Sequence, residues 1–163
     1  MGQKIIIRKF EPKDMNEVLK LVREHAAEAE VFQNLPIDDV YAKETIRKAL
    51  IDEANQAIVV EKGGEIVGYS LVGLATKIWN PTLYAEVYFF YVKNGVRNKY
   101  LADSLHEATC SWAYQNGAQW IEFSVALFDE KYQGKEEYIK RASTYFEHKG
   151  GSACGNIFVQ ELV

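Results

Sequence analysis

The sequence predicts an α/β protein of the α+β type, in which helices flank a central sheet. Three observations support this class. Residues 82–127 read as strand, short basic loop, helix and strand, a common α/β arrangement. Two apolar runs joined by Gly63 and Gly64 read as a β-hairpin. Helical patterns lie before and after these strands, so the predicted order is strand, two helices, three strands, helix, strand, helix and strand.

The N-terminal half begins with a strand over residues 4–10. Pro12 and Asp14 then mark a helix start, because proline suits the first turn and an acidic side chain complements the helix dipole there. A loop follows, and Asp38 or Asp39 is expected to cap a second helix. These two helices should cover one part of the sheet.

The hairpin spans residues 57–75, with Gly63 and Gly64 in a two-residue turn that needs positive φ. Gly68 and Gly73 in its second strand indicate either bulges or close packing. Residues 76–81 are expected to cross from this strand to the next.

The next segment, residues 82–92, is apolar on both faces and rich in β-branched and aromatic residues, so we expect a central strand. Strict alternation places Glu86, Tyr88, Phe90 and Val92 on one face. The helix that follows has an apolar stripe made of Leu101, Leu105, Ala108 and Trp112. Between strand and helix, three cations (Lys93, Arg97 and Lys99) and the backbone N–H groups of a helix start predict an anion-binding site.

The C-terminal part predicts a fifth strand over residues 118–127 and a last helix that ends at Gly150 and Gly151, where glycine suits a left-handed cap. A final strand is expected over residues 156–163. No repeat or linker interrupts the pattern.

The composition fits one domain over residues 1–163, since 48% of the residues are hydrophobic and can form a substantial core. The net charge of −4 does not favour binding to nucleic acid or to an anionic membrane surface. The sequence shows no long apolar run and no signal-peptide pattern, so we expect a cytoplasmic protein.

Cysteine and histidine residues do not suggest a metal site. Cys110 and Cys154 lack a CxxC spacing, and small buried residues are the first interpretation, with a disulfide or a catalytic thiol as the alternatives. His106 lies four residues before Cys110 on the predicted helix, but two ligands alone do not hold a metal ion. We therefore expect no metal.

The run VKNGVRNKYLADSL resembles the acyl-CoA-binding signature of the GNAT N-acetyltransferases, Arg/Gln-x-x-Gly-x-Gly/Ala at a helix start. Arg97 and Ala102 match it, whereas Tyr100 replaces a glycine. The element order also resembles the GNAT order. This resemblance implies a mixed, mostly antiparallel central sheet of about six to seven strands, about four flanking helices, and acetyl-CoA as cosubstrate. By resemblance, the cofactor contacts are the strand residues Phe90, Tyr91 and Val92 and the loop and helix residues Arg97, Asn98, Lys99, Tyr100, Leu101 and Ala102.

The segment RASTYFEHKGG resembles a second GNAT motif, in which a tyrosine acts as general acid toward the coenzyme A thiolate. Phe146 occupies the tyrosine position here, and Gly151 replaces the aromatic residue after the glycine. Tyr145 is the neighbouring phenol, about 100° round the helix. It is our candidate acid, and packing on the sheet is the alternative.

Transfer to an amine needs a base, because an alkylamine of pKa about 10.4 is protonated at neutral pH. Glu86 is the acidic residue inside the central strand, where a carboxylate is costly unless it is paired or faces a cleft. It is our candidate general base, with a structural carboxylate as the equal alternative. Glu122 is the second choice.

The resemblance implies an N-acetyltransferase that acts on a small-molecule or peptide amine by direct transfer. Phe32, Gln33 and Asn34 are candidates for the acceptor wall by resemblance, and an ordinary surface loop is the alternative. Homodimers are common in the family and remain open here. The competing functions are an inactive GNAT-like module that binds an acyl-CoA or a protein, and an oligomeric structural protein that exposes Trp79, Tyr84 and Trp120.

Overall fold

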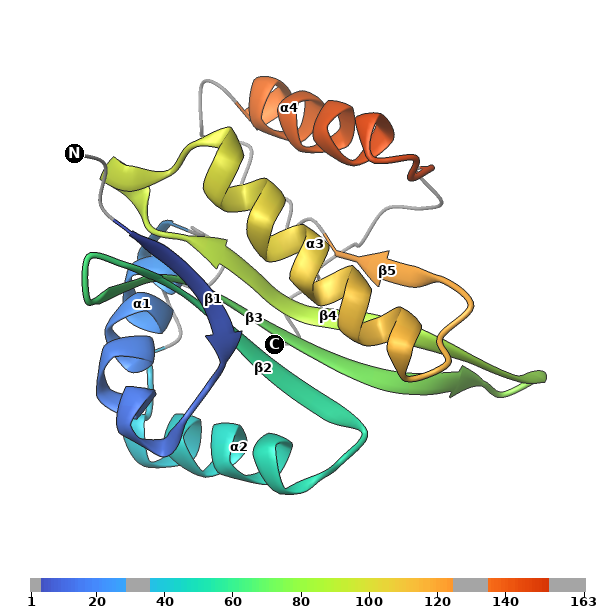
Figure 1. Cartoon of the computed structure of the whole chain (residues 1–163), viewed down its shortest axis with the longest axis horizontal. Coiled ribbons are helices and arrows are strands. Elements are labelled where there is room, and N and C mark those ends of the chain that lie inside the picture. The colour runs from blue at the N-terminus through green and yellow to red at the C-terminus, as the bar shows by residue number, and fades with distance from the viewer. Residues whose placement is uncertain (1–3, 29–35, 125–134, 153–163) are drawn as a thin grey trace, which may run out of the picture.

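The computed structural model describes residues 4–28, 36–124 and 135–152. Its strands and helices alternate along the chain much as the sequence predicts (Figure 1). In chain order they are β1 Ile5–Lys9, a 3-10 turn Pro12–Asp14, α1 Met15–Glu28, α2 Asp39–Ile51, β2 Asn55–Lys62, β3 Glu65–Lys77, β4 Asn80–Val92, a 3-10 turn Asn94–Val96, α3 Lys99–Gln115, β5 Ile121–Phe123 and α4 Lys135–His148.

The described strands form one sheet in the order β1-β2-β3-β4-β5. The first four pair antiparallel, and β5 joins β4 in parallel. This confirms the predicted mixed, mostly antiparallel sheet and the interior position of β4. The described residues contain five strands rather than the six to seven expected, and the predicted strand 156–163 lies outside them.

Two hairpins join the three long strands. Gly63 and Gly64 both have positive φ between β2 and β3, as predicted, and Lys62 pairs with Glu65 next to the turn. The expected crossing over residues 76–81 is wrong. Lys77 pairs with Asn80, so β3 turns directly into β4 through Ile78 and Trp79. The two strands pair along almost their whole length, which leaves no residues for a crossing.

The helices lie on opposite faces of the sheet: α3 runs along one face, and α1 and α2 lie on the other (Figure 1). Under α3, the core contains Val60, Val92, Leu101, Leu105 and their neighbours. Under α1 and α2, it contains Leu19, Leu21, Tyr69, Leu71, Tyr91 and others. The predicted α3 stripe is therefore confirmed, and so is the Asp38 cap, whose carboxylate accepts from two amides of α2.

A β-bulge in β4 changes which residues share a face. Leu71 pairs with Phe89 but the next residue, Val72, pairs with Val87, so Tyr88 is an extra residue in β4. Ala85 and Val87 before the bulge, and Phe90 and Val92 after it, therefore all face α3. The prediction that Glu86 shares a face with Phe90 and Val92 is wrong, because one inserted residue reverses the alternation.

Candidate active site

The candidate site begins where the described pairing of β4 with β5 ends. Ala85, Glu86 and Val87 pair with residues 121–123, and from Tyr88 onward β4 has no partner on the β5 side among the described residues. An unpaired strand edge presents main-chain N–H and C=O groups that an extended amide-bearing ligand can bind. The predicted contacts Phe90 to Val92 lie along this stretch of β4.

The start of α3 presents two backbone amides. The Asn98 side chain caps the helix by accepting from the Leu101 N–H at 3.0 Å. The main-chain carbonyl of Asn98 accepts from the Ala102 N–H at 3.2 Å. Within the described residues, the N–H groups of Lys99 and Tyr100 have no acceptor. The Lys99 side chain is 82% exposed, and its ammonium group lies 3.9 Å from the Asp103 carboxylate one turn further along the helix. Amides, helix dipole and ammonium together form a site for an anion.

Tyr100, which replaces the signature glycine, adopts ordinary backbone geometry. None of the described non-glycine residues has positive φ, so this position does not need glycine for its dihedral angles. The Tyr100 side chain is 65% exposed. Its Cβ and ring therefore add bulk beside the two amides without distorting the helix start.

Arg97 contacts the protein at two donors. Its Nε donates to the Val92 carbonyl at 2.8 Å, and Nη2 donates to Glu28 Oε2 at 2.8 Å. Glu28 comes from the end of α1, distant in sequence from the loop that contains Arg97. The sequence analysis missed Glu28, because an exposed acidic residue at a helix end shows no pattern that would indicate this partner.

Aromatic side chains surround this ion pair on the α1 face. The Tyr91 hydroxyl donates to Glu28 Oε1 at 2.6 Å, and burial together with this carboxylate raises the pKa of Tyr91 to about 12. The His25 ring stacks on Tyr91 with centroids 4.7 Å apart, and its Nδ1 lies 3.0 Å from the Tyr69 hydroxyl. Burial lowers the pKa of His25, which favours the neutral imidazole.

Glu86 lies two residues before the bulge and is half-buried. It pairs with Gly73 on β3 and with Glu122 on β5. Among the described residues, its carboxylate forms no hydrogen bond and no ion pair. The phenol of Tyr88 crosses over Gly73, next to Glu86, and burial and the Glu86 charge raise the pKa of this tyrosine.

Residues 17–134 match the acetyltransferase (GNAT) family. The chain belongs to the GNAT family. No curated protein sequence matches the chain. The family match covers most of the chain, including the strand edge of β4, the start of α3 and Glu86.

Solved structures of GNAT proteins share the fold at low sequence identity. A GNAT family acetyltransferase from Staphylococcus aureus is 15% identical with a TM-score of 0.67, and the match covers 99% of this chain and 100% of that one. An aminoglycoside acetyltransferase from an uncultured soil metagenomic sample, solved with sisomicin, is 16% identical with a TM-score of 0.70, covering 98% and 97%. Glucosamine-6-phosphate N-acetyltransferase from Arabidopsis thaliana is 13% identical with a TM-score of 0.70, covering 98% and 99%.

Glu122, the second candidate base, has occupied oxygens. It accepts from the Lys77 ammonium at 3.0 Å and from the Trp120 indole at 3.0 Å. These two hydrogen bonds lower the pKa of Glu122. A carboxylate held in its charged form by two donors is a weaker proton acceptor, so the geometry favours Glu86 over Glu122.

The motif in α4 places its two aromatic residues differently. Phe146 contacts Phe123 of β5, with ring centroids 4.7 Å apart. Tyr145 contacts His106 of α3, and its buried hydroxyl has no hydrogen-bond partner within the described residues. Burial and the neighbouring Asp103 carboxylate raise the pKa of Tyr145. The GNAT motif would place its acid where Phe146 lies, so this geometry does not favour Tyr145 as the acid.

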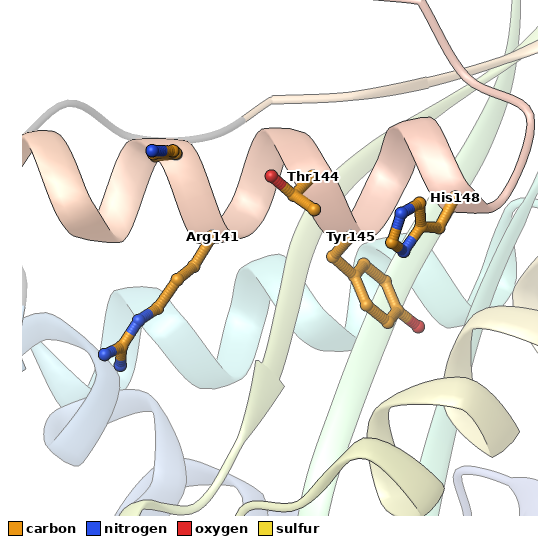
Figure 2. A pocket seen from close by; sticks show the side chains of 5 residues that line it. Arg141, Thr144, Tyr145 and His148 are labelled. Carbon is orange, nitrogen blue, oxygen red and sulfur yellow. The ribbon is translucent and has the colours of Figure 1, made fainter.

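A pocket with a volume of about 510 Å³ lies against α4. Figure 2 shows Arg141 and Tyr145 pointing to the same side of the helix, as expected for residues four apart. The described residues that line the pocket are Lys140, Arg141, Thr144, Tyr145 and His148. The described lining of this pocket comes from α4, whereas His25 and Glu28 belong to α1 on the opposite face of the sheet from α3.

The remaining candidates give a mixed result. Phe32, Gln33 and Asn34 lie outside the described residues, as does Cys154. Cys110 is a half-buried free thiol whose pKa is raised by burial, in line with the small-buried-residue interpretation.

No group of three metal-ligating side chains occurs within residues 4–28, 36–124 and 135–152. No helix in the described part of the chain is long and apolar enough to cross a bilayer.

Proposed function

We propose that this protein is an N-acetyltransferase that transfers an acetyl group from acetyl-CoA to a primary amine by direct attack. The proposal rests on three features that follow one another from β4 to the start of α3. Among the described residues, the part of the β4 edge without a partner begins at Tyr88 and leads toward the start of α3, where the amides of Lys99 and Tyr100 have no acceptor. Glu86 lies at the other end of this path, beside the bulge.

The residues present fit an acyl-CoA. The amides of Lys99 and Tyr100 with the Lys99 ammonium group suit a pyrophosphate, and the edge of β4 suits a chain that contains amide groups. Bound acetyl-CoA would supply the thioester carbonyl that the amine attacks. Main-chain donors next to the bulge can stabilise the oxyanion that develops, because they are oriented before the reaction.

Glu86 is the proposed general base. It removes a proton from the ammonium form of the acceptor, directly or through water, so that the nitrogen lone pair can attack the carbonyl carbon. The attacking nitrogen of the tetrahedral intermediate then loses its second proton, the carbon–sulfur bond breaks, and the thiolate leaves and takes up a proton to give the free thiol. We do not propose Tyr145 as the acid that protonates the thiolate, because the described contacts of its ring are with residues of α3 and α4.

Two observations favour the inactive GNAT-like module as the second candidate. Phe146 occupies the position of the family acid and cannot donate a proton. Glu28 also neutralises Arg97, which matches the first position of the cofactor signature. This candidate predicts that the protein binds acetyl-CoA or a partner without turnover.

Thermal unfolding with and without acetyl-CoA tests the proposed cofactor site. Ligand at about 100 times its Kd adds about 2.7 kcal/mol, which raises Tm by roughly 5–11 °C for a domain of this size. Lys99→Ala removes the ammonium group, and Lys99→Pro also removes the amide while proline still suits the first helical position. Asn98 before it is extended, which a following proline requires.

We expect Lys99→Pro to lose more of the Tm shift than Lys99→Ala. No shift for the natural protein at millimolar acetyl-CoA would contradict the proposed function. If the shift is present, release of free thiol in a panel of primary amines separates the enzyme from the inactive module. The acceptor, the single domain over residues 1–163, the cytoplasmic location and the homodimer stay predictions from the sequence.

A further inference from the structure

Arg97 and Glu28 form a clamp between α1 and the loop before α3. The guanidinium group bridges Glu28 at the end of α1 and the carbonyl of Val92 at the end of β4, both at 2.8 Å. The Arg97 side chain is 40% exposed and that of Glu28 is 32% exposed, so the pair lies at the surface, where an anion can reach it. The loop thus has a fixed cation directly before the amides of Lys99 and Tyr100.

The clamp leaves capacity for a ligand. An arginine side chain has five N–H donors, and the described residues engage two of them. Both oxygens of Glu28 are engaged, one by Arg97 and one by the Tyr91 hydroxyl. The carboxylate therefore has a defined orientation, and so has the guanidinium group that it holds.

Tyr91 is itself held in place. Its side chain is only 4% exposed, its ring stacks on His25, and the guanidinium group of Arg97 lies 5.4 Å from its ring centroid. His25 is anchored in turn by its contact with the Tyr69 hydroxyl. Glu28 thus connects the rigid interior under α1 to the exposed loop.

We infer that Glu28 is a positioning residue of the acyl-CoA site, which holds Arg97 by hydrogen bonding so that its remaining donors bind a phosphate. This inference rests on the proposed function. Holding a long side chain in one rotamer before binding removes part of the entropy cost of association. The charge of Glu28 acts in the opposite direction, because a carboxylate beside the site repels an anionic ligand.

Two substitutions separate these effects. Glu28→Gln removes the charge, but its carbonyl can still accept from Arg97 and its NH₂ group can donate to the Tyr91 oxygen. Glu28→Ala removes the charge and both contacts. The two variants therefore have the same charge and differ in whether position 28 holds Arg97 and contacts the Tyr91 hydroxyl.

The experiment measures Kd for acetyl-CoA by calorimetry and the steady-state constants for both variants, with Tm in the absence of ligand as a folding control. We expect Glu28→Gln to bind about threefold more tightly than the natural protein, and Glu28→Ala to bind about fivefold to tenfold more weakly than Glu28→Gln. The difference between Gln and Ala should appear in KM for acetyl-CoA and not in kcat.

Arg97→Ala supplies the second half of the test. If Glu28 acts through Arg97, the difference between Glu28→Gln and Glu28→Ala should disappear when Arg97 is removed. Equal Kd values for the two Glu28 variants, or a difference that persists without Arg97, would overturn this inference alone. A natural protein that binds no acetyl-CoA would overturn the proposed function and this inference together.

Discussion

Glu86 and Glu122 occupy paired positions on neighbouring strands, yet their carboxylates have different surroundings. Glu122 accepts from Lys77 and from Trp120, whereas Glu86 lies beside the Tyr88 phenol and no ion pair forms with it in the described part of the chain. A carboxylate without a cationic partner can exchange a proton with a ligand more readily. The two residues are therefore a natural pair for comparison.

Glu86→Gln should lower kcat/KM for an amine acceptor by about 10²-fold to 10⁴-fold, the usual contribution of a general base. Glu122→Gln should change it by less than about tenfold and should cost at most about 1 kcal/mol of stability, since it loses a surface ion pair. Steady-state thiol release and urea unfolding measure both effects. Full activity of Glu86→Gln would exclude it as the base.

The hydroxyl of Tyr145 is buried beside Asp103 and faces α3. If it does not act as the acid, Tyr145→Phe should keep kcat within about threefold, and its free energy of unfolding should stay within about 1 kcal/mol of the natural protein. The check is kcat at saturating acetyl-CoA together with urea unfolding. A loss of kcat of about 10²-fold with unchanged stability would assign the acid to Tyr145 after all.

At the scale of the element, β3 contains two glycines that make room for β4 in different ways. A Cβ at position 68 would lie 2.9 Å from the Tyr91 carbonyl oxygen, which belongs to the backbone. A Cβ at position 73 would lie 2.4 Å from Asn55 Oδ1 and 2.7 Å from the Tyr88 hydroxyl, which are both the ends of side chains. A side chain can move aside, whereas the paired backbone of two central strands cannot.

Gly68→Ala should therefore lower the free energy of unfolding by about 1–3 kcal/mol, as overpacking usually does. Gly73→Ala should cost less than about 1 kcal/mol, but it should raise KM for the amine because the displaced Tyr88 lies next to Glu86. Urea unfolding and steady-state kinetics of the two variants test this. Equal losses of stability would show that the backbone contact at Gly68 relaxes.

The bulge in β4 is the other feature at this scale. One extra residue at Tyr88 reverses the alternation of the strand and leaves main-chain groups unpaired next to Glu86. The sequence places the strand correctly but not the bulge, because residues 82–92 are apolar on both faces. Without a polar face, nothing in the pattern shows where the register shifts.

At the scale of the whole molecule, two histidines connect stability to pH. Burial lowers the pKa of His25 and of His106. Each of these histidines belongs to a helix and stacks on the aromatic ring of a strand residue. Glu28 and Arg97 also face His25, and Asp103, Glu107 and Lys149 face His106. In each case burial has the largest effect.

Because both pKa values are lower in the folded state, the unfolded state binds more protons below about pH 6.5. The free energy of unfolding should therefore fall between pH 7.5 and 5.5, by at most about 1.4 kcal/mol for each histidine. Urea unfolding at both pH values measures this loss. His25→Phe and His106→Phe should each reduce it, and an unchanged loss in both variants would contradict the assignment.

The sequence by itself determined the fold class, the order of the elements over residues 4–124 and the family. These follow from local patterns: apolar periodicity, the glycine turn at residues 63–64, the cap of α2, and a signature in consecutive residues. Such features depend on neighbours along the chain, so they can be read without coordinates.

Only the tertiary structure decided what surrounds the site. The pairing of Arg97 with Glu28, the stacking of His25 on Tyr91 and the approach of Tyr145 to His106 all join residues from different elements. The bulge at Tyr88 depends on how β4 pairs with β3. Side chains that are far apart in sequence meet only after the sheet and helices have packed, and packing is a property of the assembled elements and not of any one segment.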